Sequence, residues 1–278
     1  MKIKFLGTGA AEGVPAVFCN CEFCNAVRNA GETEFRTRAQ VVIDDVLSVD
    51  FPPDAYYHSL KFGVNLSNLK YLLVTHSHMD HFYAHDFVLR GYKFAKLSED
   101  KLKIYGNAEV KKVFGECTAR EIRESVSSHL DFTVIKPFEE LFVGEYRIIT
   151  IPASHSKLED ALLFYIESGE KGYLHLYDTG WVSDEAIDFL AHKKTKADVV
   201  CFDCTFVENS GGEGARHMGI SENMTIKNKL SERGIIDANT KIIISHFSHN
   251  SAPFRDSLKK IEQQYGVTAA YDGYEIEI

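Results

Sequence analysis

One short motif constrains this chain more than any other part of its sequence. It reads His-Ser-His-Met-Asp-His and closely follows the apolar run Tyr71–Val74. Neutral imidazole nitrogens and carboxylate oxygens are good metal ligands. Side chains two positions apart on an extended segment point to the same side, so His76 and His78 can bind one ion. The adjacent pair Asp80 and His81 can then face another, and the motif predicts two metal ions side by side.

Size and composition indicate a large folded core. The chain has 278 residues, of which 45% are hydrophobic, and no linker divides it, so we expect one domain over residues 1–278. No apolar stretch is long enough for a transmembrane helix, and the N-terminus lacks the apolar segment of a signal peptide. We therefore expect a cytoplasmic protein without a membrane partner. The formal net charge of −9 argues against nucleic acid as a partner.

Alternating and buried apolar runs predict strands, and amphipathic patterns predict helices. The expected strands cover residues 2–6, 40–43, 46–49, 72–74, 103–105, 132–135, 145–151, 161–166, 173–177, 198–202 and 241–244, and the second and third form a hairpin around Asp44 and Asp45. The expected helices cover residues 53–61, 82–94, 109–114, 119–127, 184–192, 221–233 and 252–265, with Ser221 as an N-cap, and a long loop follows Gly7 through the first cysteines. This order favours layers of helix, sheet, sheet and helix.

Further metal ligands are expected where other strands end, because four side chains cannot complete two coordination spheres. His155, Asp178 and His246 each follow a predicted strand. Taken singly, Asp178 could cap a turn before Gly180, and His155 could be an exposed loop histidine. Three such residues at strand ends fit one shared metal site at the edge of the sheets.

A second set of metal-binding side chains lies near the N-terminus. Cys19, Cys21 and Cys24 place three thiols within six residues. In a chain without an export signal, clustered cysteines suggest a metal before a disulfide. A structural zinc site needs four ligands, and His249 is the best candidate for the fourth. The alternative is three thiols without metal.

The order of these motifs resembles the metallo-β-lactamase superfamily: His-x-His-x-Asp-His, a later His, Asp-Thr-Gly, and a His at a strand end. This resemblance implies an α/β fold, the αββα four-layer sandwich. It also implies a division of the ligands, in which His76, His78 and His155 bind one ion, Asp80, His81 and His246 bind the other, and Asp178 bridges them. Asp50, after residues 46–49, resembles the aspartate that supports this site in the family.

A narrower resemblance rests on Gly7-Thr8-Gly9, on Gly13-Val14-Pro15 and on the cysteine cluster. These segments are similar to the PhnP family of cyclic-phosphate phosphodiesterases. That similarity implies a structural zinc on Cys19, Cys21, Cys24 and His249 beside a two-metal active site. It also implies a further histidine near the scissile phosphate, matched by His217, with Asp203 at the preceding strand end.

The expected function is hydrolysis of a small phosphodiester, such as 5-phosphoribosyl 1,2-cyclic phosphate, by a hydroxide that bridges two divalent ions. His217 would act as the acid, and Asp80 would orient the hydroxide. Zinc, manganese or iron could fill the active site, with zinc at the thiols. The alternatives are a transfer-RNA 3′-processing ribonuclease and a non-hydrolytic protein similar to PqqB. Pocket-forming loops can differ from the family, and the oligomeric state, including a homodimer, stays open.

Overall fold

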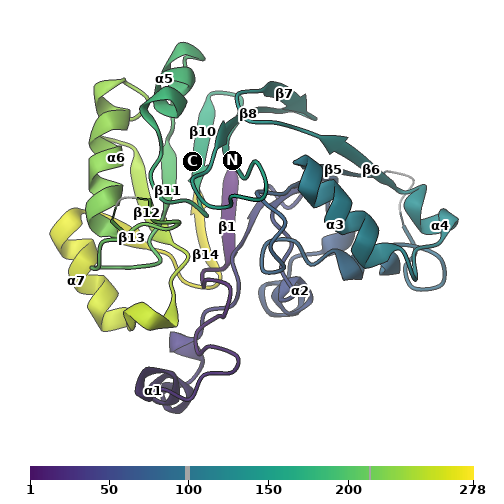
Figure 1. Cartoon of the computed structure of the whole chain (residues 1–278), viewed down its shortest axis with the longest axis horizontal. Coiled ribbons are helices and arrows are strands. Elements are labelled where there is room, and N and C mark those ends of the chain that lie inside the picture. Colours follow the sequence, from purple (N-terminus) through teal and green to yellow (C-terminus); the bar gives the residue numbers. More distant parts are fainter. Residues whose placement is uncertain (98–100, 213) are drawn as a thin grey trace.

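The computed structural model of the chain describes residues 1–97, 101–212 and 214–278, and two seven-stranded sheets lie at its centre (Figure 1). The first sheet has the order β14-β1-β2-β3-β4-β5-β6. Its strands are β1 (Lys2–Gly7), β2 (Gln40–Ile43), β3 (Leu47–Val49), β4 (Tyr71–Leu73), β5 (Leu102–Gly106), β6 (Leu130–Val134) and β14 (Tyr274–Glu277). The predicted hairpin joins β2 and β3, and Asp44 and Asp45 at its turn have positive φ values of 50° and 59°.

The second sheet has the order β13-β12-β11-β10-β9-β8-β7. Its strands are β7 (Glu140–Val143), β8 (Tyr146–Pro152), β9 (Leu162–Ser168), β10 (Lys171–Leu176), β11 (Val199–Asp203), β12 (Lys241–Ser245) and β13 (Thr268–Ala269). Strands β10 to β13 are parallel, so their carboxyl ends meet at one edge, where loops from several strands can build a site.

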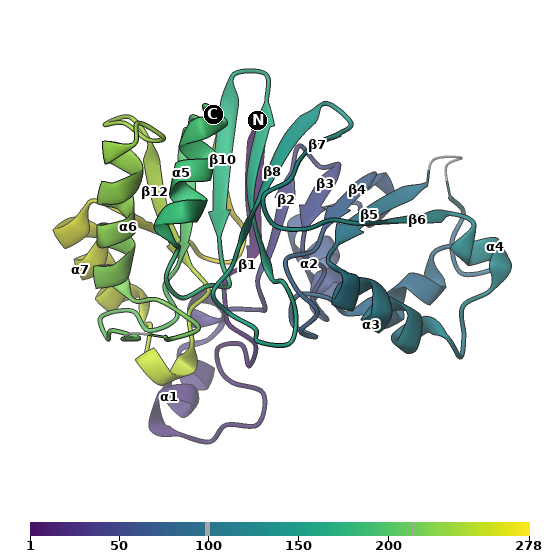
Figure 2. The same ribbon diagram turned by 45° about the horizontal axis from the view of Figure 1, so that its top comes forward.

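The helices flank the two sheets and, with the exception of α1, cover their outer faces. They are α1 (Glu22–Ala30), α2 (Ala55–Phe62), α3 (Ala108–Thr118), α4 (Glu124–Ser127), α5 (Asp184–His192), α6 (Ile220–Glu232) and α7 (Arg255–Tyr265), with short 3-10 turns at Glu32–Glu34, Leu66–Asn68, Ala84–Leu89 and His249–Ser251. In both ribbon views α1 lies apart from the sheets (Figure 1 and Figure 2). Within the described residues, none of these helices combines the length and apolarity needed to span a bilayer.

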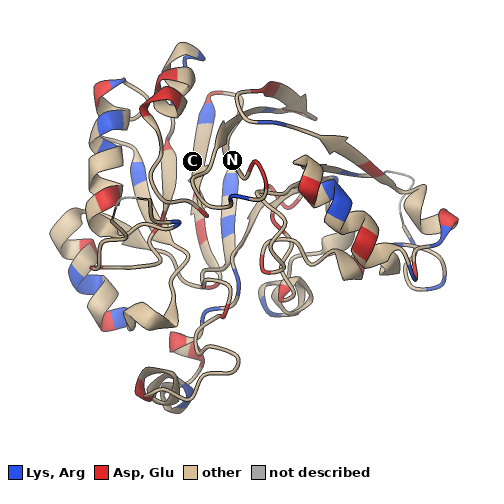
Figure 3. Ribbon diagram, viewed as in Figure 1, with Lys and Arg blue, Asp and Glu red and all other residues tan. Residues whose placement is uncertain are grey.

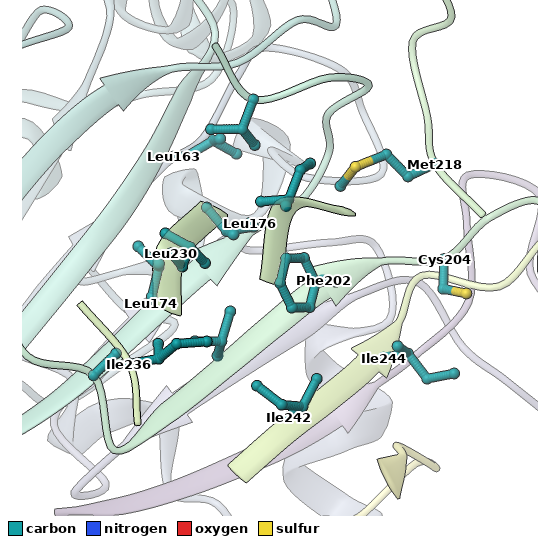
Figure 4. Packing of buried hydrophobic residues seen from close by; sticks show 14 of the residues in the cluster. Leu163, Leu174, Leu176, Phe202, Cys204, Met218, Leu230, Ile236, Ile242 and Ile244 are labelled. Carbon is teal, nitrogen blue, oxygen red and sulfur yellow. The ribbon is translucent and has the colours of Figure 1, made fainter. Parts of the chain in front are cut away.

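Three apolar clusters separate the layers. One lies between the sheets and includes Phe5 and Phe164. A second packs the outer face of the second sheet against α5, α6 and α7, and Figure 4 shows Leu174 of β10, Phe202 of β11 and Leu230 of α6 among its members. The third packs the first sheet against α2 and α3 and includes Val110. The predicted four-layer αββα sandwich is confirmed.

Several expected elements are shorter or differently placed. Residues 82–94 contain only the 3-10 turn Ala84–Leu89, because Tyr83 N–H donates to the Phe51 carbonyl in a β-bridge and Gly91, with φ 136°, follows the turn. The helix expected at 119–127 is reduced to α4. Ser221 is not an N-cap, since α6 begins at Ile220 after Gly219.

The expected loop through the cysteines is also wrong in part, because α1 begins within it. Cys21 is the N-cap of α1, and its sulfur accepts a hydrogen bond from Cys24 N–H. A thiol is a weak acceptor, so the sequence gives little capping signal here. The final helix, α7, begins at Arg255 rather than Ala252, whose φ of 47° is left-handed. Strands β7, β13 and β14 were not predicted.

Candidate metal centre

Loops from both sheets converge at the carboxyl ends of their parallel strands. The predicted motif follows β4 of the first sheet, whereas His155, Asp178 and His246 follow β8, β10 and β12 of the second. Two groups of ligand atoms contain the predicted ligands, and within each group all atoms lie within 4.8 Å of one another: His76, His78 and His155 in one, and Asp80, His81, Asp178 and His246 in the other. His217 falls within the same distance in two overlapping groups, one with His155 and Asp178 and one with Asp203 and His246. The structure thus brings together all seven predicted active-site ligands.

The first group consists of three imidazoles. Nε2 of His76 lies 2.9 Å from Nδ1 of His78, and Nε2 of His155 lies 3.2 Å from the same atom. Asp178 Oδ2 approaches this group, at 4.0 Å from His76 Nε2 and 3.8 Å from His155 Nε2. Three imidazole nitrogens and one carboxylate oxygen suit a divalent transition metal.

The second group uses the other oxygen of Asp178. Oδ1 lies 2.9 Å from His246 Nε2 and 3.1 Å from His81 Nε2, and Asp80 Oδ2 is 3.2 Å from His81 Nε2. Despite these distances, Asp178 Oδ1 and both Nε2 atoms are buried and make no aligned hydrogen bond within the described residues. Buried polar atoms are normally paired, so three that converge without partners fit a cation. Divalent ions are therefore compatible with these residues.

The charges of the second group are strongly coupled. Burial disfavours the charged form of Asp178, but His246 and His81 hold the pKa of its carboxyl well below the usual value. Burial also lowers the pKa of His81, and the nearby carboxylates, Asp178 first, raise it well above the usual value. Opposite charges at contact distance stabilise one another in such a buried site.

Asp50 anchors this group from the first sheet. Its Oδ2 lies 2.6 Å from His81 Nδ1, and its Oδ1 accepts a hydrogen bond of 2.8 Å from Thr75 N–H. Asp50 has a φ of 65° and His246 a φ of 62°, so both turn sharply at a strand end. A carboxylate behind a histidine fixes the ring and leaves its far nitrogen for metal. Thr75 was missed because its role depends on this long-range contact.

His217 and Asp203 form a neighbouring pair. His217 Nδ1 lies 2.8 Å from Asp203 Oδ2. The His217 ring stacks on His246 with centroids 5.4 Å apart and meets the His155 ring edge-on at 4.9 Å. Burial lowers the pKa of His217, but Asp203 outweighs it and raises that pKa to about 9. Thr205, which the sequence did not single out, accepts from or donates to His246 Nδ1 at 2.9 Å and also bonds Asp203 Oδ1.

Arg216 contributes to the site through its backbone. Its carbonyl lies 3.2 Å from His155 Nδ1, which fixes that ring. This loop closely approaches Gly180, where an added Cβ would lie 1.9 Å from the Ala215 carbonyl oxygen. Glycine at this position therefore lets the His217 loop reach the Asp-Thr-Gly turn.

Glu159 was also missed by sequence reasoning. Its carboxylate accepts hydrogen bonds from Ser77 N–H at 3.0 Å, from Ser77 Oγ at 2.7 Å and from Asn107 Nδ2 at 2.8 Å. Ser77 lies between His76 and His78. Glu159 consequently ties the loop that carries His155 to the histidine motif. A glutamate in a loop carries no signal for this role in a single sequence.

The cysteine cluster forms a separate group. Cys19, Cys21, Cys24 and His249 offer four ligand atoms within 4.8 Å of one another, and His249 Nδ1 lies 3.4 Å from Cys24 Sγ. Hydrogen bonds from Cys24 N–H and His249 lower the pKa of Cys21 to about 6, whereas burial raises the pKa of Cys24 to about 11. Three thiols and one imidazole are a suitable set for zinc.

Comparisons with known proteins agree with this architecture. The chain matches the beta-lactamase superfamily domain over residues 41–242. An octanoyltransferase of Porphyromonas gingivalis is 34% identical over 85 residues, which are 29% of this chain but only 16% of that protein.

Solved structures show the same fold over the whole chain. A diphosphatase from the PhnP family has a TM-score of 0.72 at 18% identity, covering 100% of this chain and 97% of that one. Zinc-bound PqqB from Methylobacterium extorquens has a TM-score of 0.72 at 17% identity, covering 100% of both chains. The short form of human tRNase Z has a TM-score of 0.70 at 17% identity, covering 100% and 99%. The chain belongs to the metallo-β-lactamase superfamily and resembles its PhnP family in fold.

Proposed function

We propose that the protein is a metal-dependent phosphodiesterase that hydrolyses a small, cyclic phosphodiester such as 5-phosphoribosyl 1,2-cyclic phosphate. The observation that carries this proposal is the position of Asp178, whose two oxygens each face a different histidine group. His217 lies beside both groups, with its ring close to His155 and His246. Two cations and one adjacent acid form a set that can catalyse hydrolysis of a phosphodiester.

The two groups would hold two divalent ions, zinc, manganese or iron, with Asp178 between them. When bound, such ions lower the pKa of water and neutralise charge on phosphoryl oxygens. The cysteine cluster would hold one zinc ion that stabilises the N-terminal arm, the segment from Cys19 through α1, rather than taking part in chemistry.

The chain itself supplies the proton and the orientation. Asp203 holds His217 through Nδ1, which leaves Nε2 free to donate to a phosphoryl oxygen or to the leaving alkoxide. An alkoxide is a poor leaving group, so a positioned acid lowers the barrier as the P–O bond breaks. Asp80, at the edge of the second group, would orient the attacking water.

The charge distribution favours a small substrate over RNA. The formal net charge is −9, and Figure 3 shows acidic and basic residues interspersed on the helices. A transfer-RNA-processing enzyme would need a basic surface that tracks phosphates. The complete His/Asp set favours hydrolysis over a non-hydrolytic role like the one considered for a PqqB-like protein.

A substrate panel tests the proposal. Purified, metal-loaded protein would be assayed with bis-p-nitrophenyl phosphate, 5-phosphoribosyl 1,2-cyclic phosphate, a linear dinucleotide, a diphosphate ester and precursor transfer RNA. We expect the cyclic diester to give the highest kcat/KM, and Asp178→Asn to abolish its turnover. Preference for the diphosphate or the RNA would reassign the substrate class. No turnover by protein shown to contain both ions would reject a hydrolytic role.

A further inference from the structure

A cavity of about 300 Å³ lies between α7 and the segment that leads from β13 into β14. Arg36, Arg255, Lys259, Glu262 and Tyr271 are among its lining residues. None of these side chains belongs to either histidine group or to the cysteine cluster. Three of the five are cations, so the cavity is electropositive although the whole chain is acidic.

Arg36 is the most unusual of these residues because its guanidinium is buried. The residue is 4% exposed, and its Nη1 donates to Thr8 Oγ1 at 3.0 Å and to the Ala270 carbonyl at 2.7 Å. One face of the guanidinium covers the Phe247 ring at 4.6 Å. Its Nε is buried and has no hydrogen-bond partner within the described residues. A buried cation with an unpaired donor is costly unless something else satisfies it.

Asp272 and Glu34 act electrostatically on Arg36 but form no ion pair with it. Asp272 accepts hydrogen bonds from Thr8 Oγ1, Thr37 N–H and Thr37 Oγ1. Glu34 accepts one from the Arg255 backbone N–H. Both acids act on Arg36 only from a distance, and burial lowers the pKa of its guanidinium to about 10. The positive charge is therefore only partly compensated by the protein.

Arg255 adds a second guanidinium at the same cavity. It lies over the Tyr271 ring at 4.8 Å and forms no ion pair among residues 1–97, 101–212 and 214–278. Glu262 is already engaged, since its Oε1 accepts a hydrogen bond from Ala269 N–H. Two guanidinium groups without carboxylate partners thus border one cavity.

We infer that this cavity binds the phosphate group of a small phosphate monoester, between Arg36 and Arg255. A guanidinium offers planar, paired donors that match phosphate oxygens, and the negative charge of a phosphate would compensate the buried positive charge of Arg36. The volume leaves room for a small organic part beside the Tyr271 ring. The site is separate from the metal centre and does not depend on the proposed phosphodiesterase activity.

Calorimetric titration of the metal-loaded protein with inorganic phosphate tests this site. Arg255→Gln is the informative variant because Arg255 is only half-buried and its loss should leave the fold intact. We expect one phosphate-binding event to weaken by about tenfold to a hundredfold in this variant. Arg120→Gln, which changes an exposed arginine at the end of α3, is the matched control and should bind phosphate like the wild type.

Two further measurements distinguish phosphate binding in this cavity from phosphate binding at the metal centre. Arg255→Gln should leave the metal centre intact, so phosphate should still bind there. Unchanged turnover of the best substrate by this variant would verify that the metal centre is unaffected. Lys259→Gln, on the exposed side of α7, should weaken the same event by a smaller factor. Identical phosphate isotherms for the wild type and Arg255→Gln would overturn the inference.

Discussion

Oδ2 of Asp203 lies 2.8 Å from Nδ1 of His217, although the two residues come from the end of β11 and from the loop before α6. The same carboxylate accepts a hydrogen bond from Thr205 N–H at 3.0 Å and from Thr179 N–H at 3.2 Å. One buried aspartate therefore fixes the His217 ring and the Asp-Thr-Gly turn together. The contact that holds His217 lies outside both predicted ligand groups, but His217 also comes within 4.8 Å of ligand atoms of His155 and Asp178, so its role is separated from metal binding by measuring metal content beside activity.

His217→Ala should lower kcat by roughly 10²–10⁴ while both active-site ions remain bound, because the variant loses a proton donor but no expected ligand. Steady-state kinetics and elemental analysis on the same preparation measure the two effects. His192→Ala, at the exposed C-terminal end of α5, is the control and should retain full activity. An unchanged kcat in His217→Ala would remove this residue from the mechanism.

Glu159→Gln should weaken metal binding by roughly tenfold to a hundredfold, since a residue that orients a ligand loop affects affinity indirectly. Glutamine keeps one acceptor oxygen for Ser77, but its amide NH₂ cannot accept the hydrogen bond that Asn107 Nδ2 donates to Oε2 of Glu159. Competition with a chromogenic chelator measures the affinity. The exposed Glu145→Gln serves as control, and equal affinities in the two variants would show that the Glu159 contact does not orient the histidines.

Cys21→Ser should remove one zinc ion per chain and lower the melting temperature, because a structural zinc contributes folding free energy. Cys21 also caps α1, so the N-terminal arm should lose order. Zinc content and thermal unfolding are the measurements. Cys117→Ser changes a cysteine outside the cluster and should alter neither quantity. Normal zinc content in Cys21→Ser would contradict a three-thiol site.

His58 should make stability depend on pH. It is buried on α2, 2.6 Å from Thr37 Oγ1 and 2.7 Å from Gln40 Oε1, and burial lowers its pKa from 6.5 to about 4. Between these values the unfolded chain binds a proton that the folded chain does not. The contribution of His58 is therefore present above pH 6.5 and lost as the pH falls toward 4, by up to about 3 kcal/mol.

Urea unfolding at pH 7.5 and 5 measures this dependence. His58→Gln should show a smaller loss of unfolding free energy between the two pH values than the wild type, even if it is less stable overall. His192→Gln provides the comparison with an exposed histidine. The same loss in His58→Gln and the wild type would assign the pH dependence to other groups.

Most of the candidate site could be predicted from the sequence because the pattern that marks each ligand lies within a few neighbouring residues. An apolar strand followed at once by ligand residues identifies His76 and His246 without knowledge of the fold. Parallel strands then bring these ends to one edge, which is why seven dispersed residues could be grouped. The four layers follow from the same strand and helix patterns.

The residues and elements that were not predicted depend on long-range contacts, which cannot be recognised in a single sequence. Glu159 reaches Ser77 across 82 positions, and Thr75 gains its role only once Asp50 turns through a positive φ. The 82–94 segment has helical composition, but at its start the backbone N–H of Tyr83 donates to the Phe51 carbonyl instead of to a helical partner. The local helix propensity of that segment was therefore overridden by its β-bridge to Phe51, which follows β3.

The ligand loops come from both sheets, so neither half of the sandwich alone holds a complete set of donors. A chain with only the second sheet formed would present His155, Asp178 and His246 without the histidines that follow β4. Cations at this interface would favour the joined halves over any half-formed intermediate. Ion uptake during refolding should therefore mark the last step, the closure of one sheet on the other.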